Sequence, residues 1–203
     1  NNTALGFQAL YANPTASGNI AIGYKAALNT ANNFNVAIGA GFTGLVDAAL
    51  QANTSGAYNI AIGSGALASS STLSNNIAIG YHAGLSNTSG TLMTAVGYLA
   101  AKANTSGLDT TAFGQRALTA NTTGSYNTAL GSGTLETNTT GAYNVTVGRI
   151  SSFANTTGSY NTAIGTEALR YNTTAGYNVA VGYQALYTSN RISDVFAINT
   201  AVG

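Results

Sequence analysis

One short phrase, Asn-x-Ala-x-Gly, recurs along this chain at a nearly constant interval. It stands as NTAIG at 161–165 and again as NVAVG at 178–182. Aligned on its glycine and allowing a few substitutions, the phrase occurs twelve times, at intervals of 17, 16, 24, seven times 17, and finally 21 residues. A fixed period of this kind is typical of a solenoid and not of a globular domain. The repeat glycines are Gly6, Gly23, Gly39, Gly63, Gly80, Gly97, Gly114, Gly131, Gly148, Gly165, Gly182 and Gly203.

The phrase itself has the alternating pattern of a short β-strand. The residue three before each glycine is always Thr, Ile or Val, and the residue one before it is always Leu, Ile, Val or Phe. Between them stands Ala, replaced only by Thr146. Strands place such neighbours on opposite faces, so we expect the large apolar residues to point into a packed layer and the Ala to face a closely approaching backbone.

The other half of each period consists of turn residues, as in ALTANTTGSYN at 117–127. Asn, Thr and Gly favour bends, so each coil is predicted to hold two short strands separated by two bends. Seventeen residues are too few for a strand and a helix together. The predicted fold is therefore all-β: a parallel β-solenoid of about twelve 17-residue coils, forming a rod about 55 Å long at about 4.8 Å per coil.

We interpret residues 1–203 as a single repeat domain with insertions at 40–51 and 189–198. The chain begins and ends within the repeat phrase, whereas solenoids usually have atypical capping repeats. We therefore expect a fragment of a longer fibre, or a subunit that stacks end to end.

Asparagine occupies the position four before the glycine in ten copies, and Met93 and Thr110 replace it in the other two. If coils stack in register, these side chains lie above one another along the axis. Amides stacked in this way bond to each other, so the sequence predicts an asparagine ladder.

The segments NIAIGYKA at 19–26 and NVAVGYQA at 178–185 resemble the head repeats of trimeric autotransporter adhesins of the YadA type. They are also similar to repeat segments of phage tail fibres. The resemblance implies a left-handed β-roll in a homotrimer, located outside the cell, on its surface or on a virion. It implies an adhesin head or fibre shaft that associates with itself and contacts a surface glycan or a matrix protein.

Composition excludes several other functions. Six basic and five acidic residues cannot form the basic stripe that nucleic-acid binding requires. No apolar run is long enough to span a bilayer, and there is no cysteine. His82 is the only histidine and falls in a column that we expect to be solvated, while the acidic residues are dispersed. We predict no catalytic site, no metal site and no cofactor. A column of threonines suggests ice binding, but Ile and Val share that column.

Two groups of residues are candidate sites. Four tyrosines directly precede the repeat asparagine on consecutive coils, and a row of such rings is either a ligand platform for carbohydrate or a coil-to-coil contact. Asn-x-Ser/Thr sequons recur in the turn and predict glycosylation. The tyrosines are Tyr126, Tyr143, Tyr160 and Tyr177, and the sequon asparagines are Asn53, Asn87, Asn104, Asn121, Asn138, Asn155 and Asn172.

Overall fold

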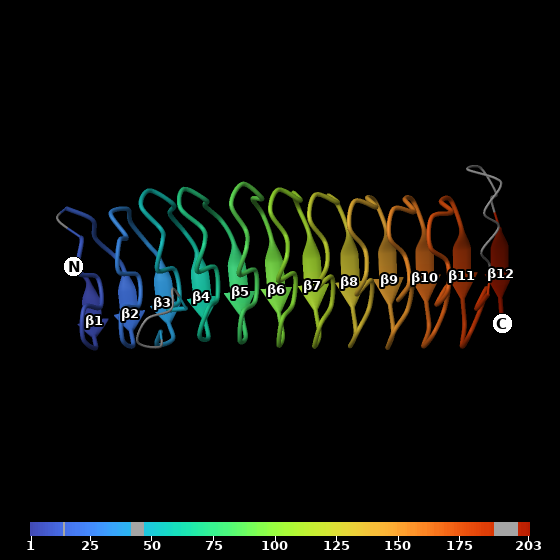
Figure 1. The fold of residues 1–203 in the computed structure, drawn as a ribbon, viewed down its shortest axis with the longest axis horizontal. Coiled ribbons are helices and arrows are strands. Elements are labelled where there is room, and N and C mark those ends of the chain that lie inside the picture. Colours follow the sequence, from blue (N-terminus) through green and yellow to red (C-terminus); the bar gives the residue numbers. More distant parts are fainter. Residues whose placement is uncertain (14, 42–46, 189–198) are drawn as a thin grey trace.

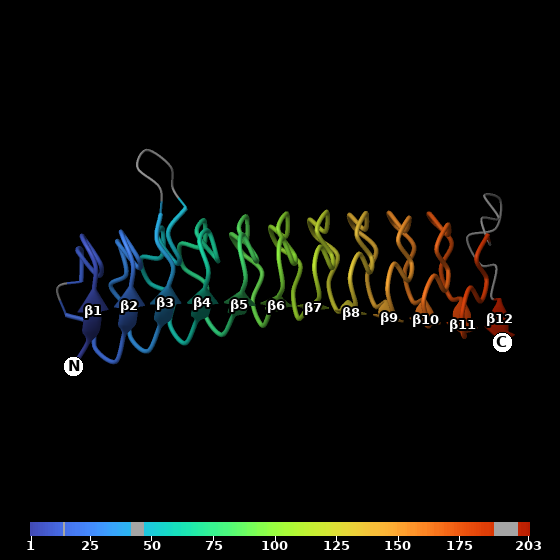
Figure 2. The same ribbon diagram turned by 90° about the horizontal axis from the view of Figure 1, so that it is seen from below.

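A computed structural model describes residues 1–13, 15–41, 47–188 and 199–203. The chain winds into a rod in which each coil contributes one strand of three residues (Figure 1). The twelve strands form one parallel sheet in sequence order along one side of the rod (Figure 2). The strands are β1 (Thr3–Leu5), β2 (Ile20–Ile22), β3 (Val36–Ile38), β4 (Ile60–Ile62), β5 (Ile77–Ile79), β6 (Thr94–Val96), β7 (Thr111–Phe113), β8 (Thr128–Leu130), β9 (Val145–Val147), β10 (Thr162–Ile164), β11 (Val179–Val181) and β12 (Thr200–Val202).

The repeat sets the register of this sheet. Each residue of a strand pairs with the same repeat position of the next coil, as Ala163 pairs with Ala180 between β10 and β11. The longer interval before β4 does not disturb the register, since Ala37 still pairs with Ala61. The predicted all-β parallel solenoid is confirmed.

The prediction of a second strand in each coil is wrong for the described residues. The segment after the glycine is a series of turns in which every other residue has a left-handed backbone, such as Arg116 (φ 59°) and Leu118 (φ 52°). These turns still bond from coil to coil, because the N–H of Leu118 donates to the carbonyl of Thr134 at 3.1 Å. Left-handed conformations are unfavourable for residues other than glycine, so the stacked hydrogen bonds of neighbouring coils hold them in place.

The orientation predicted for the strand residues is also wrong. The central alanines point into the coil, and Ala129 is 0% exposed. The flanking residues point outward, and Phe113 and Ile164 are 56% and 41% exposed. Such a short coil encloses too little space for two large side chains on each strand, so alanine occupies the interior. The close backbone approach expected at alanine occurs at the repeat glycine instead.

A column of leucines four residues after the glycine completes the core. Leu67, Leu118 and Leu169 are all 0% exposed. One coil has Gly84 at this position, and the side chain of Met93 fills the space that a leucine would take, since a Cβ on Gly84 would meet Met93 Cε. Met93 thus replaces an asparagine of the predicted ladder in the coil that has glycine at this position, whereas Ala27, Ala101 and Ser152 take the place of leucine in other coils.

This pairing predicts a coupled pair of substitutions. Gly84→Leu alone overpacks the core against Met93 and is expected to lower the unfolding free energy by about 1–3 kcal/mol. Met93→Asn alone leaves a cavity beside Gly84 and costs about 2 kcal/mol. The double variant restores the leucine and asparagine that the preceding coil has as Leu67 and Asn76, and Leu67 adopts φ 49° in the position where Gly84 has φ 58°. Denaturant unfolding of the wild type and the three variants measures the effect. The double variant should lose less unfolding free energy than the sum of the losses in the two single variants. A loss equal to that sum would contradict the proposed compensation.

The insertion predicted at 40–51 is shorter than expected. Leu50 is fully buried, and its N–H donates to the carbonyl of Ala66 at 3.0 Å, as the N–H of Leu10 does to Ala26. The end of the predicted insertion therefore belongs to a regular coil. Residues 42–46 and the insertion at 189–198 lie outside the described residues.

Candidate functional site

The predicted asparagine ladder is present in the coil interior. The amide oxygen of Asn144 accepts hydrogen bonds from the backbone N–H and the side-chain Nδ2 of Asn161, at 2.9 and 3.1 Å. The same pair of bonds joins Asn178 to Asn161. Where Met93 replaces asparagine, its backbone N–H still donates to the amide oxygen of Asn76 at 3.0 Å. These bonds tie successive coils together from Asn2 to Met93 and from Asn127 to Asn199. Thr110 interrupts the ladder between them, and its buried hydroxyl has no hydrogen-bond partner among the described residues.

The sequon asparagines form a second ladder that we did not predict from the sequence. The Nδ2 atom of Asn138 donates to the amide oxygen of Asn121 at 2.8 Å and to the carbonyl of Gly141 at 2.9 Å. Asn155 bonds in the same way to Asn138 and Gly158. The signal was the recurrence of this asparagine at one position of six consecutive coils, from Asn87 to Asn172, which we interpreted as turn chemistry.

This burial is incompatible with glycosylation of the folded coil at these positions. Every sequon asparagine proposed as a glycan acceptor is at most 1% exposed. A glycan on Nδ2 would remove the hydrogen bonds of the ladder and would have no path to solvent. The prediction therefore fails for Asn53, Asn87, Asn104, Asn121, Asn138, Asn155 and Asn172.

The repeat glycines end the strands in a conformation that side chains rarely adopt. Gly131 has φ 138°, and a Cβ there would lie 2.5 Å from the carbonyl oxygen of Gly148 on the next coil. From Gly6 to Gly182 the repeat glycines have φ between 125° and 157°. Only glycine satisfies both the backbone angle and the close approach. The final repeat glycine, Gly203, has no described coil beyond it.

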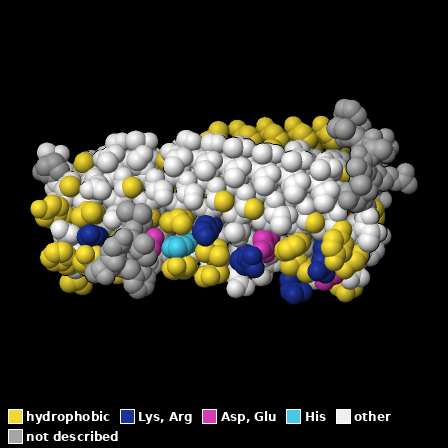
Figure 3. Space-filling view, viewed as in Figure 1, with side chains coloured by type: hydrophobic (Ala, Val, Ile, Leu, Met, Phe, Trp, Pro, Cys, Tyr) yellow, Lys and Arg dark blue, Asp and Glu magenta, His cyan; other side chains and the backbone are white. Residues whose placement is uncertain are grey.

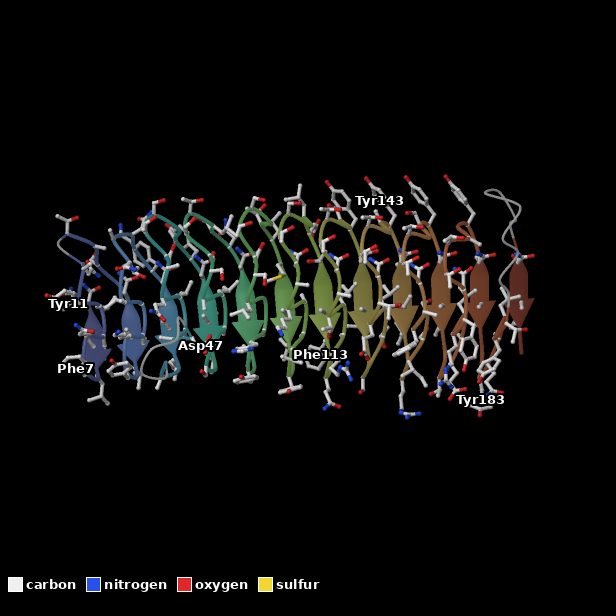
Figure 4. The ribbon with its side chains drawn as sticks, viewed as in Figure 1. Phe7, Tyr11, Asp47, Phe113, Tyr143 and Tyr183 are labelled. Atoms are coloured by element: carbon white, nitrogen blue, oxygen red, sulfur yellow. The ribbon has the colours of Figure 1, made fainter. Side chains whose placement is uncertain are left out.

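The four tyrosines lie together as a ladder of stacked rings on one edge of the rod, where Figure 4 shows Tyr143 pointing away from the ribbon. Ring centroids are 4.8 Å apart between Tyr126 and Tyr143, and 4.9 Å apart both from Tyr143 to Tyr160 and from Tyr160 to Tyr177. The four residues have φ between 58° and 61° and are 43–48% exposed. We call these four residues the tyrosine ladder.

The charged side chains gather on the opposite edge, along the lower side of the view in Figure 3. Among the described residues, Asp109 alone lies elsewhere, in the column of the tyrosine ladder. Two carboxylates of the lower edge pair with arginines: Glu136 with Arg116 at 2.5 Å and Glu167 with Arg170 at 3.1 Å. The residues of this charged edge are Lys25, Asp47, Lys102, Arg116, Glu136, Arg149, Glu167 and Arg170.

His82 lies on the charged edge and is less solvated than predicted. Its side chain is 15% exposed, its ring stacks on Tyr81 at 3.9 Å between centroids, and Nε2 lies 3.7 Å from the carboxylate of Asp47. Burial lowers the pKa of His82 below its ordinary value, and the Asp47 carboxylate opposes this shift. The ring is therefore a packed, mostly neutral side chain near pH 7.

A second polar cluster surrounds Glu167 on the same edge. Its carboxylate accepts hydrogen bonds from Gln184 Nε2 at 2.8 Å and pairs with Arg170 Nη1 at 3.1 Å. The hydrogen bond from Gln184 contributes most to lowering the pKa of Glu167 below its ordinary range, and the charge of Arg170 lowers it further. The Arg170 guanidinium also lies 5.1 Å from the ring centroid of Tyr171. A carboxylate held ionised by such partners is suited to pairing and is a poor proton donor.

Within the described part of the chain, no group of three or more His, Cys, Asp or Glu side chains is placed to hold a metal ion. No helix in the same residues has the length and apolarity needed to cross a membrane.

No protein family, curated sequence or solved structure matches the chain significantly.

Proposed function

We propose that this chain is a segment of an extracellular structural fibre: a stiff, non-enzymatic rod that serves as the shaft or head of an adhesin or of a similar attachment organelle. The observation that carries the proposal is the uncovered outer face of the twelve-stranded sheet. All-parallel sheets usually have both faces covered, whereas here one face packs on the coil interior and the other is open. A phage tail-fibre shaft is the alternative, with the same physical role on a virion.

The open face is suited to self-association. It carries two columns of Thr, Val, Ile, Leu and Phe and no charged residue, so covering it desolvates no charge. Val145, Ile164 and Val179 are 36–42% exposed there. We propose that copies of the rod pack through this face, as a trimer according to the resemblance of the repeats.

Light scattering of the purified chain at micromolar concentration tests the proposal, with a mass of three chains as the expected result. Replacing Ile79 and Ile164 with lysine on the outer face should reduce the mass to that of one chain while the β-type circular dichroism is retained. Tyr183→Lys is the matched control, because Tyr183 is 67% exposed on the charged edge (Figure 4) and should leave the assembly intact. A monomeric wild-type protein, or a double variant that still assembles, would contradict self-association through this face.

A further inference from the structure

The tyrosine ladder presents a ribbed aromatic strip parallel to the rod axis. Stacked rings need about 3.5 Å between their planes, so rings whose centroids are 4.9 Å apart must slip sideways past each other. The planes of neighbouring rings differ by 18°, 2° and 9° along the ladder, so all four rings are close to parallel. Each ring therefore leaves part of its face uncovered, and the four rings together extend about 15 Å along the rod.

The surroundings of the ladder leave this strip accessible. The residues that directly precede the four tyrosines are Ser125, Ala142, Ser159 and Gly176, which are too small to cover the rings. The rungs are also held firmly, because the backbone N–H of each tyrosine donates to a carbonyl of the preceding coil, as Tyr160 does to Ala142 at 3.0 Å. The strip is thus a rigid feature of the folded coil.

A carboxylate lies next to the N-terminal end of the tyrosine ladder. Asp109 occupies the same column one coil before Tyr126, with the same left-handed backbone (φ 49°), and is exposed. Because Asp109 has no aromatic ring, it does not stack on the face of Tyr126 that is turned toward it. The nearest charge to the ladder is therefore negative, and the described basic residues lie on the opposite edge.

We propose that the tyrosine ladder and Asp109 form a binding site for elongated, flat, conjugated aromatic cations that lie along the rod axis. A planar conjugated ligand about 15 Å long contacts several rungs at once, and its positive end meets Asp109 and the free face of Tyr126. A pyranose ring, in contrast, stacks on a whole aromatic face, and the slipped stack offers such a face only at its ends. This site is independent of the proposed fibre function, since the ladder lies outside the open face of the sheet.

Thioflavin T, a flat cationic dye that fluoresces when its internal rotation is restricted, is a suitable probe. Titration of the full chain should give saturable binding that Tyr143→Ala with Tyr160→Ala weakens at least about tenfold. Tyr143→Phe with Tyr160→Phe keeps the rings and should retain the affinity. Asp109→Asn should weaken binding about threefold to tenfold and reduce its dependence on salt.

The matched control removes a stacked tyrosine pair from the charged edge. Tyr81 and Tyr98 have centroids 5.7 Å apart, and replacing both with alanine should leave thioflavin T binding unchanged. Circular dichroism of each variant establishes that the coil is folded. Full binding by the folded Tyr143/Tyr160 alanine variant, or loss of binding in the Tyr81/Tyr98 variant, would overturn the site. Unchanged binding by the Asp109 variant would overturn the preference for cations.

Discussion

Replacing Gly131 with valine is expected to destabilise the solenoid by at least about 3 kcal/mol, among the largest effects of any single substitution in this chain. The backbone at Gly131 has φ 138°, a region that β-branched residues do not adopt without strain. The added side chain would also collide with the backbone of the next coil, since a Cβ would lie 2.5 Å from the carbonyl oxygen of Gly148. A backbone neighbour cannot rotate aside as a side chain can. Thermal unfolding followed by circular dichroism measures the loss.

Ser132→Val is the control for this prediction. Ser132 is the next residue in the chain and is exposed, so the same side chain placed there meets no backbone of the next coil. Its effect should stay within about 0.5 kcal/mol. If valine at Gly131 were tolerated as well as at Ser132, the stacking distance between coils in the structure would be wrong.

Replacing Asn138 with leucine should cost about 3–5 kcal/mol, because this one side chain makes three buried hydrogen bonds. Nδ2 of Asn138 donates to the amide oxygen of Asn121 and to the carbonyl of Gly141, at 2.8 and 2.9 Å. Its amide oxygen accepts from Nδ2 of Asn155 at 2.8 Å. Leucine has nearly the same size but leaves the amide oxygen of Asn121 unpaired in a dry interior. The Gly141 carbonyl and Nδ2 of Asn155 each lose one hydrogen bond and keep a second, with Asn127 and Gly158 respectively. Denaturant unfolding and amide hydrogen exchange of the neighbouring coils measure the loss.

The matched substitution for Asn138→Leu is Thr140→Val in the same turn, where the side chain is exposed. It should change stability by less than about 0.5 kcal/mol. Equal stability of the two variants would mean that the second ladder contributes little, and that its recurrence reflects turn preference alone.

The period of the sequence was sufficient to predict the fold class and the register. Seven consecutive repeat intervals of equal length bring the same residue type to the same place on each coil. The ladder that runs through Asn144 and Asn161 followed directly from this stacking, as did the row of tyrosines. Such predictions require only that each coil is shifted along the rod axis relative to the one before it, and a constant repeat interval is enough to specify that shift.

The same repeat did not show which side of each residue faces the interior. An alternating pattern has two possible orientations, and the larger side chains suggested the wrong one. The structure places Ala129 inside and Ile164 outside because so short a coil is narrow. Burial of Asn138 was missed for a related reason: Asn-Thr-Thr-Gly suits an exposed turn equally well.

The amino-acid sequence by itself specifies a rod of in-register parallel coils, because identical residues stacked at one spacing can pack against and hydrogen-bond to one another. Three-dimensional packing was needed to decide what each column does: alanine, leucine and two asparagine ladders fill a narrow interior, and the apolar strand residues form an open outer face. The physical reason is that periodicity is a property of the chain order, whereas inside and outside depend on the width of the coil, which is set by its left-handed turns and glycine corners.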